Sequence, residues 1–175
     1  MLTGAGGGIA TSIAQTLLAR GADLILVGRQ AKKAQAELGA GIAIYADLES
    51  AEGAAELREQ STGVSALVHT VGGFSKQCAW EVTGQDLQKM FTLNLGSFIY
   101  VVEAILPELR RQEKGHILGI SAGQVIRGDG KGSALYVASK AALASYIRAL
   151  NLELEANLYA SVIYPMGTVD RKSVV

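Results

Sequence analysis

The residues of this chain best suited to chemistry are a phenol and an ammonium one helical turn apart. They are Tyr136 and Lys140, within the stretch SALYVASKAAL of residues 133–143. Residues four positions apart share one face of an α-helix, with Cβ atoms about 5–6 Å apart. A free phenol titrates near pH 10, and a neighbouring cation favours its ionised form. We therefore expect a lowered pKa for Tyr136 and a role as general acid and base; the alternative is two polar residues on the surface of an amphipathic helix.

The elements that would position this pair alternate between short apolar runs and helical patterns. The expected strands are residues 23–28, 41–46, 64–71, 115–121 and 159–165. The expected helices are residues 9–20, 30–38, 50–61, 84–112 and 133–157. Near-continuous apolar strands are typical of a parallel sheet covered on both faces. The alternation therefore predicts an α/β fold, a doubly wound parallel sheet of the Rossmann type with helices on both faces.

Two irregularities interrupt this pattern. The strand that should precede the first helix has at most two or three residues, because the chain opens MLTGAGGGIA. We expect it to be a weak central strand. Pro107 lies inside the longest expected helix, and proline removes a helical hydrogen bond. We expect a kink or a break at that residue.

Length and composition exclude several classes of protein. The chain has 175 residues, 49% of them apolar, with 16 basic and 16 acidic side chains. We expect one domain, residues 1–175, because this length supports a single core. The balanced charge provides no footprint for nucleic acid or an anionic membrane, and no apolar run approaches about 18 residues. The one cysteine, Cys78, fits a reducing compartment, so we expect a cytoplasmic protein.

A glycine-rich turn, TGAGGGIA at residues 3–10, lies between the short first strand and the first helix. Glycines there let the backbone approach a pyrophosphate, and the helix N-terminus supplies N–H groups. The spacing of Gly4 and Gly8 favours a dinucleotide over a flexible turn without a ligand. No Gly-Lys-Ser/Thr follows, which disfavours a nucleoside triphosphate.

The end of the second expected strand indicates which dinucleotide would bind. Folds that select NAD place a carboxylate there for the ribose 2′-hydroxyl. This chain has Gly28 and Arg29 instead, and a guanidinium can hold a 2′-phosphate. NADP(H) is therefore favoured, and the alternative is a solvated basic start of a helix. Asp47 would accept from the adenine amine, or would cap the helix that starts near Ser50.

Together these features resemble the short-chain dehydrogenase/reductase family, along nearly all of the chain and in the right order. TGAGGGIA resembles the family's TGxxxGxG turn, with Ala10 in place of the last glycine. FTLNLGSF carries Asn94 where the family has a catalytic asparagine, and YVASK matches the YxxxK signature. VIYPMGTVD resembles the Pro-Gly segment that closes over the nicotinamide. The family assignment rests on these segments jointly.

The resemblance implies an NADPH-dependent oxidoreductase that transfers hydride between the nicotinamide and a small carbonyl or alcohol substrate. Tyr136 would exchange the proton, Lys140 would bind the nicotinamide ribose, and Asn94 would hold a water that links Lys140 to solvent. Ser121 would polarise the carbonyl oxygen. No metal is expected, and the two long helices imply a homodimer or homotetramer. The implied cofactor-binding residues are Gly4, Gly6, Gly8, Ile9, Arg29, Asp47, Gly72, Asn94, Tyr136, Lys140, Pro165, Gly167 and Thr168.

The chain departs from the family's pattern at three places. His69 and Thr70 replace two amide side chains that tie neighbouring strands together, and we expect His69 to be a structural hydrogen-bonding residue rather than an acid. Ala122 occupies the usual position of the catalytic serine. Either the loop of residues 123–132 bends so that Ser121 serves, or the reaction proceeds without a serine, as in the dihydropteridine reductase branch. We also expect no counterpart of the family's last strand and substrate lobe within these residues.

These departures leave two alternatives to an active enzyme of this length. One is a catalytically silent NADP(H)-binding sensor or partner subunit. The other is that these residues are a fragment of a longer enzyme, as the short first strand and the missing lobe suggest.

Overall fold

A computed structural model describes residues 1–166 and shows a six-stranded parallel sheet in the order β3-β2-β1-β4-β5-β6. The strands are β1 Leu2–Thr3, β2 Ile25–Val27, β3 Ile42–Ile44, β4 Ala66–His69, β5 Gly115–Ile120 and β6 Leu158–Ile163. The order reverses between β1 and β4, where a doubly wound sheet opens a crevice at its carboxyl edge. The predicted Rossmann-type architecture is confirmed.

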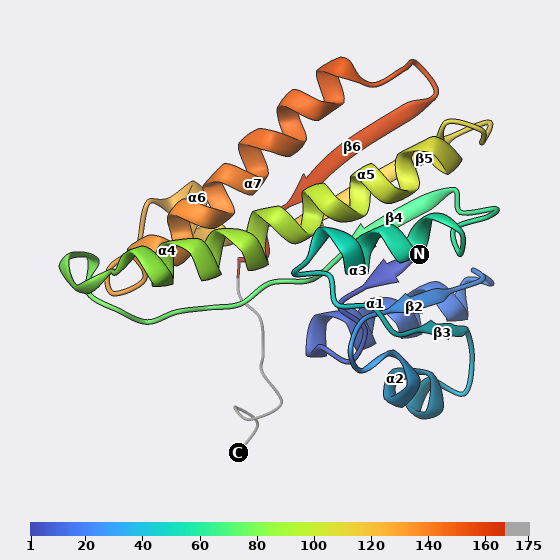
Figure 1. Ribbon diagram of the computed structural model, residues 1–175, viewed down its shortest axis with the longest axis horizontal. Coiled ribbons are helices and arrows are strands. Elements are labelled where there is room, and N and C mark those ends of the chain that lie inside the picture. The colour runs from blue at the N-terminus through green and yellow to red at the C-terminus, as the bar shows by residue number, and fades with distance from the viewer. Residues whose placement is uncertain (167–175) are drawn as a thin grey trace.

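Helices cover both faces of the sheet (Figure 1). They are α1 Gly8–Ala19, α2 Ala31–Leu38, α3 Ala51–Ala55, α4 Gly84–Phe91, α5 Ser97–Leu109, α6 Gly123–Arg127 and α7 Ala134–Glu153. Short 3₁₀ turns occur at Glu56–Arg58 and Ala79–Glu81. α1 and α2 pack on one side, and α3, α5 and α7 pack on the other. Each crossover returns the chain to the amino end of the next parallel strand. All strands therefore end at the same carboxyl edge, where the predicted site residues lie.

The larger of the two apolar cores fixes the position of α7. Leu143 and Ile147 on α7 are fully buried beside Phe98 and Ile105 on α5. Four such side chains contribute on the order of 6–12 kcal/mol of transfer free energy, since full burial of one is worth about 1.5–3 kcal/mol. This packing holds α7 against β5 and β6, with Lys140 at the carboxyl end of β5.

The central strand is short, as predicted. β1 has two residues, and it pairs with both β2 and β4. The ammonium of Met1 donates to the carbonyl of Ala66 at 2.7 Å, and burial lowers its pKa to about 6. The backbone amide of Val68 donates to the carbonyl of Met1. Hydrogen bonds from the first residue thus extend the contact between β1 and β4.

The helix expected over residues 84–112 consists of three parts. α4 begins at a capping box formed by Thr83 and Asp86. A π-helical turn, Thr92–Gly96, separates α4 from α5. Of the kink or break expected at Pro107, the break is wrong, because α5 continues through that residue to Leu109. The helix is instead distorted at the π turn, and π turns inside α-helices occur frequently at functional sites.

The same continuous stretch, Gly84–Leu109, is long and apolar enough to cross a membrane by length and composition. The expectation that no apolar run approaches that length was therefore wrong by this measure. Buried residues make up 44% of its apolar window, and α5 packs against α3. The buried core helix of a globular protein passes the same test as a membrane span. The length and composition of this stretch are therefore not enough to identify a membrane segment.

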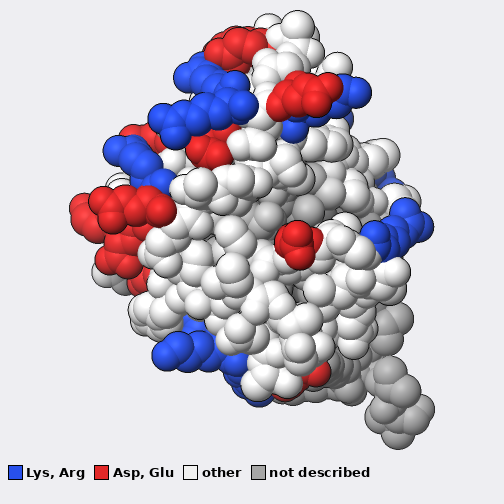
Figure 2. All heavy atoms as spheres, turned by 90° about the vertical axis from the view of Figure 1, so that its right-hand side faces the viewer, with Lys and Arg blue, Asp and Glu red and all other residues white. Residues whose placement is uncertain are grey.

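Figure 2 shows the right-hand side of Figure 1, the end of the sheet at which the strands begin. Side chains of both signs lie mainly around the edge of this face, and its centre is largely uncharged. A nucleic-acid site requires a concentrated positive field, which this face does not present.

Candidate active site

The glycine-rich turn after β1 has a backbone that other residues could not adopt without strain. Gly4 and Gly6 have φ values of +76° and +100°. A Cβ atom on Gly4 would lie 2.6 Å from Oγ1 of Thr70, and one on Gly6 would lie 2.8 Å from Cβ of Gln30. α1 begins immediately after this turn, and its N-cap residue, Gly7, contributes no side-chain cap. The first N–H groups of α1 are therefore placed for an anion.

This turn forms one wall of a pocket of about 300 Å³, here called the switch-point pocket. It lies where the strand order reverses, at the carboxyl ends of β1 to β4. Five residues predicted to bind the cofactor line it: Gly4, Gly6, Arg29, Asp47 and Gly72. Gly8 begins α1 outside this lining, and Ile9 lines the neighbouring cavity.

Arg29 is paired with a carboxylate that sequence reasoning missed. Its Nη2 atom lies 3.1 Å from Oε1 of Glu49, and both residues line the switch-point pocket. Asp47 is exposed and accepts from the backbone amide of Glu49 at 3.1 Å. Ser50, rather than Asp47, caps α3 by accepting from Gly53. Asp47 therefore remains positioned for a ligand, and Arg29 has a competing partner.

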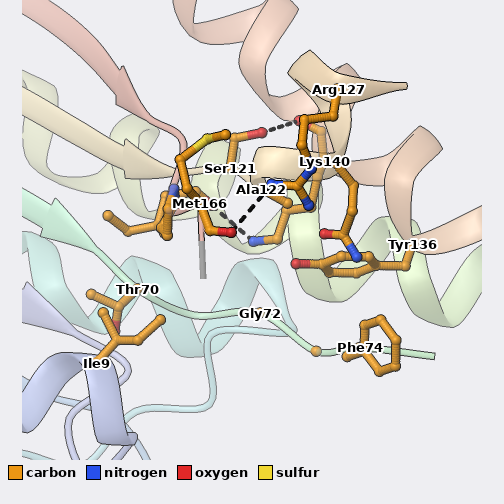
Figure 3. Close-up of a pocket in the computed structure, with 14 residues that line it drawn as sticks. Ile9, Thr70, Gly72, Phe74, Ser121, Ala122, Arg127, Tyr136, Lys140 and Met166 are labelled. Carbon is orange, nitrogen blue, oxygen red and sulfur yellow. Dashed lines mark hydrogen bonds between the residues drawn. The ribbon is translucent and has the colours of Figure 1, made fainter. Parts of the chain in front are cut away.

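Tyr136 and Lys140 lie on one face of α7, as their spacing predicted. The Tyr136 ring is half-buried and packs against Phe74, with ring centroids 4.9 Å apart at 68°. Lys140 is buried, and its ammonium donates to the carbonyl of Ile120 at 2.9 Å. Figure 3 shows the phenol oxygen directed toward the Lys140 ammonium.

The ionisation of this pair differs from the expectation. Burial lowers the pKa of Lys140 to about 8. Burial also raises the pKa of Tyr136 above its ordinary value. The predicted lowering of the Tyr136 pKa relied on Lys140 and on a nearby nicotinamide cation. It is wrong for the protein alone, because loss of solvent around the phenolate outweighs the attraction of the ammonium.

Asn94 joins the segment after β4 to α7. It lies in the π turn with no exposed surface. Its Oδ1 accepts from the amide of Gly73 at 2.9 Å, and its Nδ2 donates to the carbonyl of Gly73 and to Oγ of Ser139. A Cβ atom on Gly72 would lie 2.7 Å from both Asn94 Oδ1 and Lys140 Nζ. Asn94, Gly72 and Lys140 are thus brought together at one point.

The hydroxyl of Ser121 is held by the backbone of α7. Ser121 is 3% exposed, and its Oγ donates to the carbonyl of Lys140 at 2.9 Å. In Figure 3 this hydroxyl points away from the phenol of Tyr136. Ala122, which follows, is the N-cap residue of α6. The segment predicted to be a loop therefore begins with the short helix α6, and the bend toward Tyr136 is not observed.

His69 serves as the structural hydrogen-bonding residue that we expected. Its Nδ1 lies 2.9 Å from Oγ1 of Thr3, and its Nε2 lies 3.2 Å from Oγ of Ser97. Ser97 donates its single proton to the carbonyl of Leu93. Since Ser97 must then accept, His69 carries its proton on Nε2 and Thr3 donates to Nδ1. Burial, together with the charge of Lys140, lowers the pKa of His69 to about 3.

A second cavity of about 430 Å³, here called the Tyr136 cavity, adjoins the switch-point pocket (Figure 3). It is lined by the expected residues Ile9, Gly72, Ser121, Tyr136, Lys140 and Pro165. Thr70 and Gly72 line both cavities, so the two adjoin just after the carboxyl end of β4. The predicted residues Gly167 and Thr168 lie outside the described residues.

Comparison with known proteins identifies the family. The profile of the short chain dehydrogenases matches residues 1–171. The chain belongs to the short-chain dehydrogenase family. It is 31% identical to an uncharacterised oxidoreductase of Staphylococcus saprophyticus, over 88% of this chain and 70% of that one. It is 30% identical to an uncharacterised oxidoreductase of Bacillus subtilis, over 97% of this chain and 74% of that one.

Solved structures agree with this assignment. A short-chain dehydrogenase/reductase of Brucella melitensis, named as a glucose/ribitol dehydrogenase, superposes with a TM-score of 0.85 at 29% identity, over 93% of this chain and 72% of that one. A short-chain dehydrogenase of Shigella flexneri, solved with NADP, superposes at 0.83 and 26%, over 95% of this chain and 76% of that one. The glycine-walled switch-point pocket fits the nicotinamide dinucleotide that this family of oxidoreductases uses.

Proposed function

We propose that this protein is an NADP(H)-dependent oxidoreductase acting on a small carbonyl or alcohol substrate. The observation that carries the proposal is the position of Tyr136 and Lys140. They share one face of α7 and line a cavity that has Thr70 and Gly72 in common with the switch-point pocket. A dinucleotide in that pocket would lie beside the pair.

The residues that would hold the cofactor divide between its parts. Gly4, Gly6 and the N-terminus of α1 would bind the pyrophosphate, and Asp47 would accept from the adenine amine. Arg29 would bind the 2′-phosphate, and its five N–H donors allow it to keep one bond to Glu49 while doing so. When bound, the cofactor supplies or accepts the hydride.

The proton would be handled by groups of the chain itself. Tyr136 would hold the transferable proton on its phenol oxygen, facing the Tyr136 cavity. Lys140, with a pKa of about 8, is largely protonated at neutral pH and would favour the phenolate during transfer. Asn94 positions Gly72 and Gly73 against this pair. The role of Ser121 in polarising the substrate stays a prediction, because its hydroxyl here binds α7.

Replacement of Tyr136 by phenylalanine tests the proposal. Tyr136→Phe should lose nearly all hydride transfer and still bind NADPH, because the ring remains and only the proton carrier is removed. NADPH oxidation, followed by absorbance with a panel of carbonyls, and NADPH titration by fluorescence would show both effects. Tyr159→Phe, at an exposed residue of β6, is the matched control. Substantial turnover by Tyr136→Phe would rule out its proposed role.

A specific observation favours a second candidate, a silent NADP(H)-binding sensor or partner subunit. Ala122 lies at the usual serine position, and the Ser121 hydroxyl is already bonded to α7. This candidate predicts NADPH binding without turnover over a broad carbonyl panel. Reduction of a single carbonyl would eliminate it.

We also propose a homodimer or homotetramer. Ala138, Ala141, Ala142 and Ser145 form a small-residue flank of α7 that is exposed or half-buried in the chain. The neighbouring α4–α5 stretch is apolar and less than half buried. Two copies paired along these helices would cover both surfaces, and light scattering of the purified protein would measure the mass.

A further inference from the structure

The short helix α6 places two side chains in the Tyr136 cavity that the proposed chemistry does not use. Gln124 and Arg127 are three positions apart, so they lie on one face of the helix. Both line the cavity together with Tyr136 and Lys140. The helix begins one residue after Ala122, so it occupies the side of the cavity where the family's serine would stand.

The guanidinium of Arg127 is folded back over the start of its own helix. A Cβ atom on Gly123 would lie 2.8 Å from Nη1 of Arg127, so the absence of a side chain at residue 123 makes room for it. Nη1 donates to the carbonyl of Met166 at 3.2 Å, and Nε donates to Oδ2 of Asp129 at 2.7 Å. Figure 3 shows the guanidinium reaching from α6 into the cavity toward Met166. These two bonds orient the group and use two of its five N–H donors.

The charges that line this cavity have one sign. Its lining, taken over the described residues, contains the cations Arg127 and Lys140 and no aspartate or glutamate. Asp129 is half exposed and meets Arg127 at Nε, outside that lining. An exposed ion pair of this kind contributes little and competes weakly with a ligand. The cavity is therefore electrostatically suited to an anion.

We propose that Arg127 binds an anionic group of the substrate, a carboxylate or a phosphate, while Tyr136 faces its carbonyl oxygen. A guanidinium binds either anion through two parallel charge-assisted hydrogen bonds. Gln124 adds an amide donor on the same side of the cavity. The inference names the substrate class of the proposed reductase and rests on that function for its turnover assays.

The test compares related carbonyl compounds that carry or lack an anionic group. Pyruvate and levulinate are each assayed against their methyl esters, and dihydroxyacetone phosphate is assayed against dihydroxyacetone. We expect the wild-type kcat/KM to favour an anion about tenfold or more. Arg127→Gln should bring that ratio close to one while neutral turnover persists, and Arg127→Lys should keep part of it. Arg20→Gln, at the end of α1, is the charge-matched control.

Calorimetric titration of the same acids, phosphate and neutral partners into the NADP⁺-loaded protein provides a readout that needs no turnover. Preferential binding of anions that is lost in Arg127→Gln supports the site even if no carbonyl is reduced, which would count against the proposed function alone. Turnover without anion preference, or an equal preference in Arg127→Gln, overturns the inference and leaves the reductase standing. If neither the anions nor their neutral partners bind, the inference is overturned as well. Preference confined to the acids or to dihydroxyacetone phosphate assigns the anion.

Discussion

His69 should make this protein sensitive to mild acid. It is fully buried, and burial, with the charge of Lys140, lowers its pKa from 6.5 to about 3. Between these values the unfolded chain takes up a proton that the native protein excludes. Stability from this group is therefore complete above pH 6.5 and is lost as the pH falls toward 3. At pH 5 the loss is 1.5 pH units at about 1.4 kcal/mol each, or roughly 2 kcal/mol.

Urea unfolding at pH 7, 6 and 5 would measure this loss, and the same series on His69→Asn isolates its source. The asparagine returns an amide to the position and cannot titrate, although lost packing should lower its stability at pH 7. We expect the wild type to lose about 2 kcal/mol more than the variant between pH 7 and pH 5. The difference in pH dependence is the test, because other acid-sensitive groups such as Asp86 are common to both proteins. Parallel pH profiles would refute the reasoning, and His69→Gln would repeat the comparison with a longer amide.

Four further substitutions probe the site. Lys140→Met should reduce hydride transfer by about 100-fold or more. Its free energy of unfolding in urea at pH 7 should be unchanged or raised by about 2 kcal/mol, because the substitution removes a buried charge whose pKa is lowered to about 8. Marked destabilisation would contradict this expectation. Gly72→Ala should lower kcat and NADPH affinity while the circular dichroism spectrum is kept, since its Cβ would lie 2.7 Å from the Lys140 ammonium; an unchanged kcat would show that the ammonium has room to move. Arg29→Asp should shift the ratio of kcat/KM values from NADPH toward NADH, and Glu49→Gln should raise NADPH affinity a few-fold by releasing Arg29; a constant ratio in Arg29→Asp would exclude contact with the 2′-phosphate.

The sequence predicted the sheet and the meeting of the main site residues well, for a physical reason. Strands covered on both faces are continuous apolar runs, so the segments around β5 and β6 were recognisable without knowledge of their neighbours. Parallel strands align their carboxyl ends, so motifs that follow strands must converge. For this reason Gly4, Gly72 and Tyr136 line adjoining cavities.

What could not be predicted depends on contacts between distant segments. The pair of Arg29 and Glu49 forms because β2 and β3 end side by side. The Ser121 hydroxyl donates to the carbonyl of Lys140 on α7, and the sequence around Ser121 does not indicate that contact. The raised pKa of Tyr136 comes from burial of its phenol. Five residues of α6 are too few to show a helical period, so that helix was missed.

The π turn makes the chain unequally tolerant of changes in length. A π-helical turn holds one residue more than the α-helical turn that would replace it, so deletion of one residue within Thr92–Gly96 would leave α4 and α5 in register. α5 is anchored by seven buried residues, whereas α4 has only Met90 buried. The change would therefore fall on the turn itself, and the amide of Asn94 would be displaced from Gly73. Loss of one residue here would therefore remove the Asn94 amide from its place in the site while the buried side chains of α5 stayed packed.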